Sequence, residues 1–297
     1  MAWIEQLLLH DKTKEQVLGF LQAPSHGLLI SGPPGSGKQT LAIELSAQLL
    51  GVTTDKLSQH PYFVILSKPN DKQEIPIDTV RQLINSLKLK PAISGSGVAR
   101  RVVFIDEAQL LSEEAQNALL KLLEEPPQST TFILTVPTDK NILPTVASRL
   151  QRISINPVGL VAAQAFFEKT HPPAAVASAW SLSQGAAGLT SAILREDKDH
   201  PLKQAVDLAK KFLKMSRYER VVYLDGLSSD KQNLTELIDG LNRVLAALQR
   251  SAVADGKDSL SKRVLKSRQL VNSALDSLQM NTSTRLICLN LALSLPL

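Results

Sequence analysis

The 297-residue sequence contains a single cysteine, Cys288. One cysteine excludes an internal disulfide and any zinc site built from several cysteines. Aromatic residues make up only 4% of the chain, which argues against a base-stacking surface for single-stranded nucleic acid. No apolar run approaches the roughly 20 residues of a membrane-spanning helix, and the first residues lack the basic segment of a secretory signal. These absences predict a cytoplasmic protein with no zinc site and no membrane partner.

Positive charge is concentrated toward the end of the chain. Residues 201–297 contain 15 Lys and Arg against 9 Asp and Glu, whereas the rest of the chain is nearly neutral. A basic C-terminal third can contact nucleic acid or an acidic partner, but the solvated faces of ordinary helices have the same composition. The charge distribution alone does not decide between these two interpretations.

The length and the hydrophobic pattern predict more than one domain. Short β-rich runs alternate with helical patterns through the first half, which is typical of a parallel sheet covered by helices. We expect an α/β domain over residues 1–155, a small helical domain over 156–200 and a helical bundle over 201–297, interrupted by a polar break near Ala254–Ser261. The expected strands are Leu28–Ser31, Phe63–Leu66, Val102–Ile105, Phe132–Thr135 and Arg152–Ile155.

A glycine-rich segment, Gly32–Lys38, follows the first expected strand and opens a helical pattern. This is the context that a Walker A phosphate-binding loop requires. Glycines there let backbone N–H groups turn toward phosphate oxygens, and the lysine reaches the β- and γ-phosphates. We therefore expect ATP to bind here, the alternative being a simple glycine-rich turn. The expected nucleotide-binding residues are Gly32, Gly35, Ser36, Gly37, Lys38, Gln39 and Thr40.

The residue after the Walker lysine departs from the pattern. It is normally Ser or Thr, whose hydroxyl ligates Mg²⁺, but here it is Gln39. Thr40 comes one position late, about 100° around a helix, and cannot simply replace that hydroxyl. The amide oxygen of Gln39 could ligate the metal, but only with a longer side chain in a tight space. We expect nucleotide binding to survive this change better than hydrolysis does.

The apolar strand Arg101–Ile105 ends in two carboxylates, Asp106 and Glu107. After a phosphate loop, such a pair predicts a Walker B motif, in which Asp106 would hold Mg²⁺ through water and Glu107 would orient the attacking water. Acidic residues at a strand end are common, so this pair predicts a Walker B motif only because a phosphate-binding loop precedes it in the sequence.

Two further strings resemble the AAA+ clamp-loader subunits of bacterial DNA polymerase III. They are Ile-Asp-Glu-Ala-Gln at residues 105–109 and Ala-Gln-Asn-Ala-Leu-Leu-Lys-Leu-Leu-Glu-Glu-Pro-Pro at residues 115–127. The segment Leu143–Arg149 follows, and it is similar to the Ser-Arg-Cys motif of that family, with Leu150 in the place of the cysteine. The resemblance covers nearly the whole chain and is strongest over residues 27–155.

This resemblance implies an α/β AAA+ P-loop NTPase domain, a helical lid and an all-α collar. It also implies that Arg149 reaches into the ATP site of a neighbouring subunit, where a trans-acting arginine can contribute roughly 10³–10⁵ in rate. The alternative for this arginine is a surface salt bridge at a helix end. The implied partners are gamma/tau-type and delta-type subunits, the sliding clamp and primer-template DNA, and the implied role is to help load the clamp during replication.

Within that family, three segments resemble the delta-prime class: His60-Pro61, Ile77–Leu83 and Asn281–Leu286. Members of this class are commonly impaired in hydrolysis and donate their arginine to a neighbour. The resemblance therefore implies a stator rather than a motor.

Several positions depart from the pattern of an active ATPase. The sensor-1 position, usually Thr or Asn, aligns with Pro137, with Thr135 and Thr138 close by as alternatives. Leu189 stands where a sensor-2 arginine is expected. The four-cysteine zinc module of many relatives has no counterpart within Gly51–His60. Together with Gln39, these departures predict weak or absent ATP hydrolysis. The alternatives are an active gamma/tau-type motor, another AAA+ ATPase of DNA metabolism, and a binding module that has lost nucleotide.

Overall fold

The computed structural model describes residues 3–69, 74–88, 101–280 and 282–296. The chain divides into two compact units, Met1–Gly159 and Leu160–Leu297. The second unit contains both the expected lid and the expected collar, and the boundary between them near residue 200 stays a prediction. In the described ranges, no helix is both long enough and apolar enough to cross a membrane.

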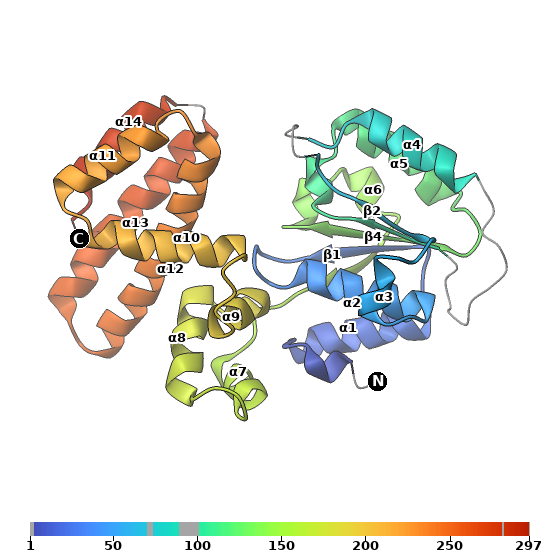
Figure 1. Ribbon diagram of the computed structural model, residues 1–297, viewed down its shortest axis with the longest axis horizontal. Coiled ribbons are helices and arrows are strands. Elements are labelled where there is room, and N and C mark those ends of the chain that lie inside the picture. The colour runs from blue at the N-terminus through green and yellow to red at the C-terminus, as the bar shows by residue number, and fades with distance from the viewer. Residues whose placement is uncertain (1–2, 70–73, 89–100, 281, 297) are drawn as a thin grey trace. The chain divides into compact units, whose positions relative to one another are not determined.

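The first unit is built on a five-stranded sheet with the strand order β2-β3-β4-β1-β5, and all of its neighbouring strands are parallel (Figure 1). All five expected strands are present: β2 has the expected ends, and the ends of the others differ by at most two residues from the expectation. Because β1 and β3 lie on either side of β4, the segments that follow them meet at one edge of the sheet. The strands are β1 (Gly27–Ser31), β2 (Phe63–Leu66), β3 (Arg101–Ile105), β4 (Thr130–Val136) and β5 (Gln151–Ser154).

Successive side chains of β1 enter two different cores, one on each face of the sheet. Leu28 and Ile30 are buried with α1–α3 on one face, whereas Leu29 is buried with α4–α6 on the other (Figure 1). Because both faces are covered, the central strands β1, β3 and β4 are buried throughout. The helices are α1 (Asp11–Gln22), α2 (Lys38–Leu50), α3 (Thr54–Leu57), α4 (Ile77–Leu87), α5 (Glu113–Glu124) and α6 (Pro144–Ala147), with 3-10 turns at Ile4–Gln6, Ala108–Leu110 and Asp139–Asn141.

The described residues of the second unit form helices around one apolar core. The polar break expected near Ala254–Ser261 separates α12 from α13. The helices are α7 (Leu160–Phe167), α8 (Pro173–Ser183), α9 (Ala187–Leu194), α10 (Pro201–Lys214), α11 (Arg217–Leu227), α12 (Lys231–Ala254), α13 (Asp258–Gln279) and α14 (Thr284–Ser294).

Gly240 marks the closest approach of α12 to α10. A Cβ atom at this position would overlap the backbone carbonyl of Ala205 and press on the Cβ of Ala209. The backbone of α10 cannot yield to this overlap without moving the helix, so Gly240→Ala should lower the free energy of unfolding by about 1–3 kcal/mol. Urea-induced unfolding of the full chain measures this change.

The matched control is Gly226→Ala, because no atom lies within 4 Å of a Cβ built on this glycine of α11. The helix propensity of alanine should leave stability unchanged or raise it by up to about 1 kcal/mol. Equal unfolding free energies for the two variants would contradict the close approach of α12 to α10.

Candidate functional site

The glycine-rich segment forms the loop that joins β1 to α2. Gly35 and Gly37 have φ angles of 82° and 90°, a left-handed conformation that glycine adopts without strain. Lys38 is the first residue of α2, and its Nζ donates hydrogen bonds to the carbonyl oxygens of Gly32 at 2.8 Å and Pro33 at 3.2 Å. The lysine thus folds back over the loop, where its ammonium group can exchange these carbonyls for phosphate oxygens.

The Walker lysine lies close to the carboxylates that follow β3. Burial lowers the pKa of Lys38, and the negative charges of Asp106 and Glu107 offset part of that lowering. The fold therefore brings the two predicted motifs together, although they are far apart in the sequence.

The loop presents a buried hydroxyl that a phosphate oxygen could bind. The hydroxyl oxygen of Ser36 is buried and has no hydrogen-bond partner among the described residues. A side chain at Gly32 would press on this hydroxyl and on Ile155, so glycine keeps this position of the loop open. A buried hydroxyl without a partner costs about 1–3 kcal/mol, which a phosphate oxygen can recover. The loop residues therefore fit a phosphate.

If Ser36 is a phosphate ligand, Ser36→Ala should weaken ATP binding by about 3- to 10-fold and leave the unfolding free energy unchanged or slightly higher. The matched control is Ser46→Ala in α2, the helix that follows the loop, where the buried hydroxyl donates to the carbonyl of Ala42. This control should lose stability while ATP affinity stays the same. Titration calorimetry and urea unfolding separate the two effects, and equal ATP affinities for both variants would contradict the role of Ser36.

Both carboxylate oxygens of Asp106 already accept hydrogen bonds from protein groups. Gln39 Nε2 donates to Oδ2 at 3.0 Å, and Thr135 Oγ1 donates to Oδ1 at 2.6 Å. Gln39 thus presents its amide nitrogen to Asp106, and an N–H group cannot ligate a cation. The site fits Mg²⁺ less well than the loop fits phosphate, because Gln39 and Asp106 must separate before the metal can enter.

Thr135, which the sequence offered only as an alternative near Pro137 for the sensor-1 position, is a residue of the site. Besides its bond to Asp106, its hydroxyl accepts a 2.9 Å hydrogen bond from the backbone N–H of Glu107. That bond holds Glu107 at φ 51°, a left-handed conformation that is uncommon outside glycine. The strand order explains this contact. Strands β3 and β4 are adjacent with Ile105 paired to Leu134, so the residues that follow this pair, Asp106 and Thr135, lie side by side. Pro137, the residue aligned with sensor 1, lies beyond the end of β4.

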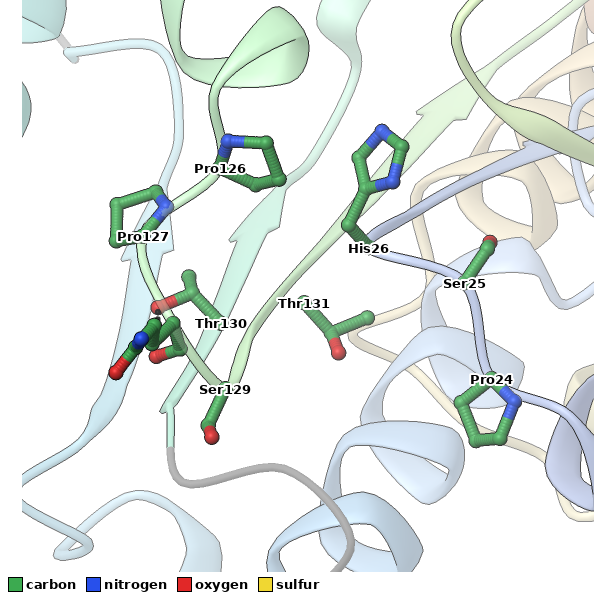
Figure 2. A pocket seen from close by; sticks show the side chains of 9 residues that line it. Pro24, Ser25, His26, Pro126, Pro127, Ser129, Thr130 and Thr131 are labelled. Atoms are coloured by element: carbon green, nitrogen blue, oxygen red, sulfur yellow. Dashed lines mark hydrogen bonds between the residues drawn. The ribbon is translucent and has the colours of Figure 1, made fainter.

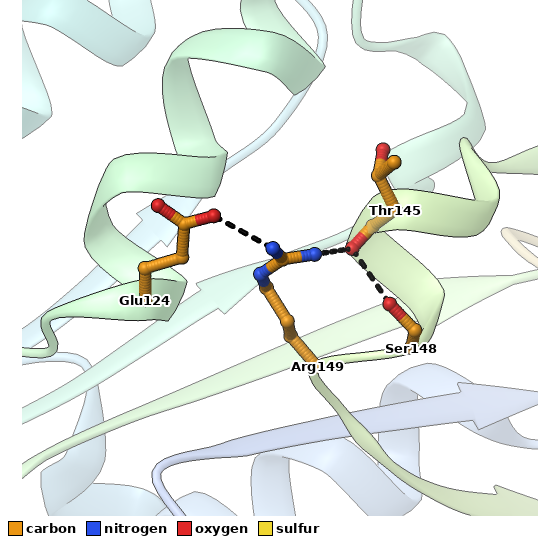
Figure 3. Close-up of polar contacts among 4 residues, drawn as sticks. All are labelled: Glu124, Thr145, Ser148 and Arg149. Carbon is orange, nitrogen blue, oxygen red and sulfur yellow. Dashed lines mark hydrogen bonds and ion pairs between the residues drawn. The ribbon is translucent and has the colours of Figure 1, made fainter.

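The predicted trans-acting arginine lies just after α6 and is held at both terminal nitrogens (Figure 3). Arg149 Nη2 bonds Glu124 Oε1 at 2.6 Å, and Nη1 donates to the carbonyl oxygen of Thr145 at 2.7 Å. The same carbonyl accepts the hydroxyl of Ser148 at 3.0 Å. The side chain of Arg149 remains 35% exposed, so the salt bridge leaves part of it open to solvent.

Helix α5 contains most of the string at residues 115–127. Residues near both ends of this helix contact the segment that carries Arg149. Near its start, buried Gln116 accepts the N–H of Leu143 at 2.8 Å and donates to the carbonyl of Leu111 at 3.2 Å. At its end, Glu124 binds Arg149. The polar residues of this string therefore fix the position of the segment that carries the arginine.

A hollow of about 300 Å³ lies at the amino ends of β1 and β4 (Figure 2). The phosphate loop follows the carboxyl end of β1, so this hollow is separate from the nucleotide site. Its lining residues are Pro24, Ser25, His26, Pro126, Pro127, Gln128, Ser129, Thr130 and Thr131.

Comparison with known sequences places the first unit among replication proteins. Residues 21–159 match the profile of a family described as "DNA polymerase III, delta subunit". The chain is 30% identical over 188 residues to the DNA polymerase III subunit delta' of Escherichia coli, covering 58% of this chain and 55% of that protein. It is 33% identical over 146 residues to the corresponding subunit of Pseudomonas aeruginosa, covering 44% and 43%. Over residues 21–159 the chain is similar to the delta-prime class of clamp-loader subunits.

The similarity extends to other clamp-loader proteins but not along their whole length. A replication factor C small subunit of Methanocella arvoryzae is 30% identical over 148 residues, covering 49% of this chain and 42% of that protein. The matches thus span about half the length of these curated relatives. A DNA polymerase III gamma subunit-related protein of Thermotoga maritima has a TM-score of 0.53 at 18% identity, over 95% of this chain and 97% of that one, which supports the AAA+ fold.

Nucleotide binding is general in the AAA+ clamp-loader family. Two of this chain's departures from the motifs of that family have a packing explanation. Leu189 is fully buried in α9, so the expected sensor-2 position holds a core residue. Leu150 is buried over Gly27, where a side chain at the glycine would overlap it. In the described ranges, no three His, Cys, Asp or Glu residues form a metal-ligating cluster. The absence of a zinc site stays a prediction.

Proposed function

We propose that this chain is a stator subunit of a DNA polymerase III clamp loader. In this role it hydrolyses ATP weakly or not at all and donates Arg149 to the ATP site of a neighbouring subunit. One observation carries the proposal: Arg149 is supported at a partly exposed position by α5 and α6, while both carboxylate oxygens of Asp106 in the chain's own site accept hydrogen bonds from protein groups. The similarity of the first unit to delta-prime clamp-loader subunits supports the same role.

The proposed assembly is a ring with gamma/tau-type and delta-type subunits that places the sliding clamp on primer-template DNA. Other members of the ring supply the hydrolysis. This chain supplies a fixed arginine to one of their sites, and its helical second unit supplies collar contacts. Replication factor C small subunits among the relatives are consistent with a ring-forming role.

Arg149 suits a role in phosphoryl transfer because a guanidinium is permanently charged and presents a planar fork of donors. In the transition state, negative charge spreads over the equatorial oxygens of the transferred phosphoryl group. A guanidinium delivered from the next subunit stabilises that charge without having to be reorganised. The nucleotide in the neighbouring site then depends on this chain for its hydrolysis.

In the chain's own site, the loop and Lys38 would hold the phosphates of ATP. Mg²⁺, when bound, supplies charge neutralisation for the phosphates, and Asp106 would hold it through water after parting from Gln39. Glu107 is exposed after β3 and would orient water. If Asp106 exchanges Gln39 for Mg²⁺ only slowly, this site would retain its nucleotide rather than hydrolyse and replace it repeatedly.

An active motor is the second candidate, because Lys38, Asp106 and Glu107 are all present and lie together. A reconstitution experiment tests the stator role directly. Clamp loading on primed DNA is measured with the remaining clamp-loader subunits, with and without this chain, and ring assembly is followed by gel filtration. We expect both the ring and loading to require the chain. Full loading by the remaining subunits alone would contradict the proposal.

A further inference from the structure

We infer that Glu124 is a positioning residue for Arg149. Its carboxylate holds the guanidinium in the orientation in which Arg149 contacts a phosphate of the ATP bound by the neighbouring subunit. This inference rests on the proposed function, because it presupposes that Arg149 acts in trans.

The two hydrogen bonds of Arg149 fix the plane of its guanidinium. One terminal nitrogen is tied to a backbone carbonyl of α6, and the other is tied to the carboxylate at the end of α5 (Figure 3). A planar group anchored at both terminal nitrogens cannot turn about its last rotatable bonds. The carbonyl of Thr145 alone would leave the other terminal nitrogen free to swing.

The anchoring leaves donors available for a ligand. A guanidinium has five N–H donors, and the two hydrogen bonds to Glu124 and Thr145 use two of them. With 35% of the side chain exposed, an incoming phosphate can reach the remaining donors while Glu124 stays bound. Glu124 therefore fixes the orientation of Arg149 and still leaves N–H donors of the guanidinium available to a phosphate.

Glu124 is itself held by a rigid helix. It is the last residue of α5, whose Leu119 and Leu123 are buried in the core of the first unit and whose Gln116 is bonded to the segment that leads into α6. A carboxylate on this helix defines a fixed point relative to α6. The next residue, Glu125, is also exposed and carries the same charge, but it makes no ion pair with Arg149.

The expected effect is moderate because the pair is exposed. Ion pairs of this kind are worth a small free energy, so Glu124→Ala should slow hydrolysis by the reconstituted ring by about threefold to fivefold. The loss should fall on the maximal rate, because an unordered arginine must be fixed again in each transition state. Glu124→Gln keeps an oxygen acceptor and should recover most of the lost rate.

Glu125→Ala is the matched control, since it removes the same charge one residue further along and should leave the rate unchanged. Combining Glu124→Ala with Arg149→Ala provides the decisive comparison. If Glu124 acts through Arg149, the double variant should be no slower than Arg149→Ala alone. A further loss in the double variant, or a Glu124→Ala ring at the unmodified rate or faster, would overturn the positioning role.

A spectroscopic measurement on the full chain gives a readout that does not depend on the ring. The side-chain Nε–H resonance of Arg149, assigned with Arg149→Lys, should shift and narrow in Glu124→Ala and stay in place in Glu125→Ala. An unmoved resonance in Glu124→Ala would contradict the contact in solution. If Arg149→Ala leaves the ring's hydrolysis unchanged, the proposed function fails. If only Glu124→Ala is without effect, the positioning role alone fails.

Discussion

Arg149→Ala should slow ATP hydrolysis at the neighbouring site of the assembled ring by about 10³-fold, the lower end of what a trans-acting arginine contributes. The chain's own fold should hardly change, because the Arg149–Glu124 pair is exposed and such pairs contribute at most about 1 kcal/mol. Arg149→Lys should recover little of the rate, since an ammonium offers a point charge in place of a planar fork.

The measurement is single-turnover ATP hydrolysis by the reconstituted ring on primed DNA, with assembly checked by gel filtration. Arg152→Ala is the matched control, because Arg152 lies close by on β5 and forms a 3.6 Å ion pair with Asp139. It should hydrolyse ATP at the unmodified rate. An Arg149→Ala ring that assembles normally and keeps the unmodified rate would mean that Arg149 is an ordinary surface residue.

The isolated chain should turn over ATP far more slowly than about 1 s⁻¹, the lower end of typical enzyme rates. The reason lies at Asp106, the residue that would hold Mg²⁺, because Gln39 Nε2 already donates to its Oδ2. Gln39→Thr removes that hydrogen bond and restores a hydroxyl at the metal-ligating position. A hydrogen bond to a charged group is worth about 1.5–3 kcal/mol, so ATP affinity in the presence of Mg²⁺ should rise by about tenfold or more.

Equilibrium titration with and without a chelator checks this expectation. The gain in Gln39→Thr should disappear when Mg²⁺ is removed, because it arises from the metal. An unchanged affinity in Mg²⁺ would identify the loop as vestigial, and rapid turnover by the unmodified chain would favour the motor candidate.

Local pattern in the sequence was enough to predict the fold of the first unit. The expected central strands are short, mainly apolar runs, and burial on both faces of the sheet is what makes those runs apolar. The phosphate loop and the carboxylates after β3 were also predictable, because each motif depends on neighbours in the sequence. The polar break near Ala254–Ser261 likewise marks the end of α12 at Ala254 and the start of α13 at Asp258.

Contacts between distant residues could not be predicted in this way. Gln39 was expected to offer Mg²⁺ its amide oxygen if it acted at all, but its amide nitrogen binds Asp106, 67 positions away. Thr135 was an alternative near Pro137 in the sequence, and its hydrogen bond to Asp106 became visible only once β4 was known to lie beside β3. Glu124 lies within the string that led to the family, yet its contact with Arg149 depends on how α5 packs against α6.

One comparison tests the central claim most directly, namely that this chain contributes an arginine to another subunit's site rather than a catalytic site of its own. Two rings are reconstituted that differ only in this chain, one with Lys38→Ala and one with Arg149→Ala, and their DNA-stimulated ATP hydrolysis is measured. Lys38 serves the chain's own loop and Arg149 serves the neighbour. The account predicts a near-normal rate with Lys38→Ala and a severe loss with Arg149→Ala. A severe loss with Lys38→Ala and a normal rate with Arg149→Ala would contradict it.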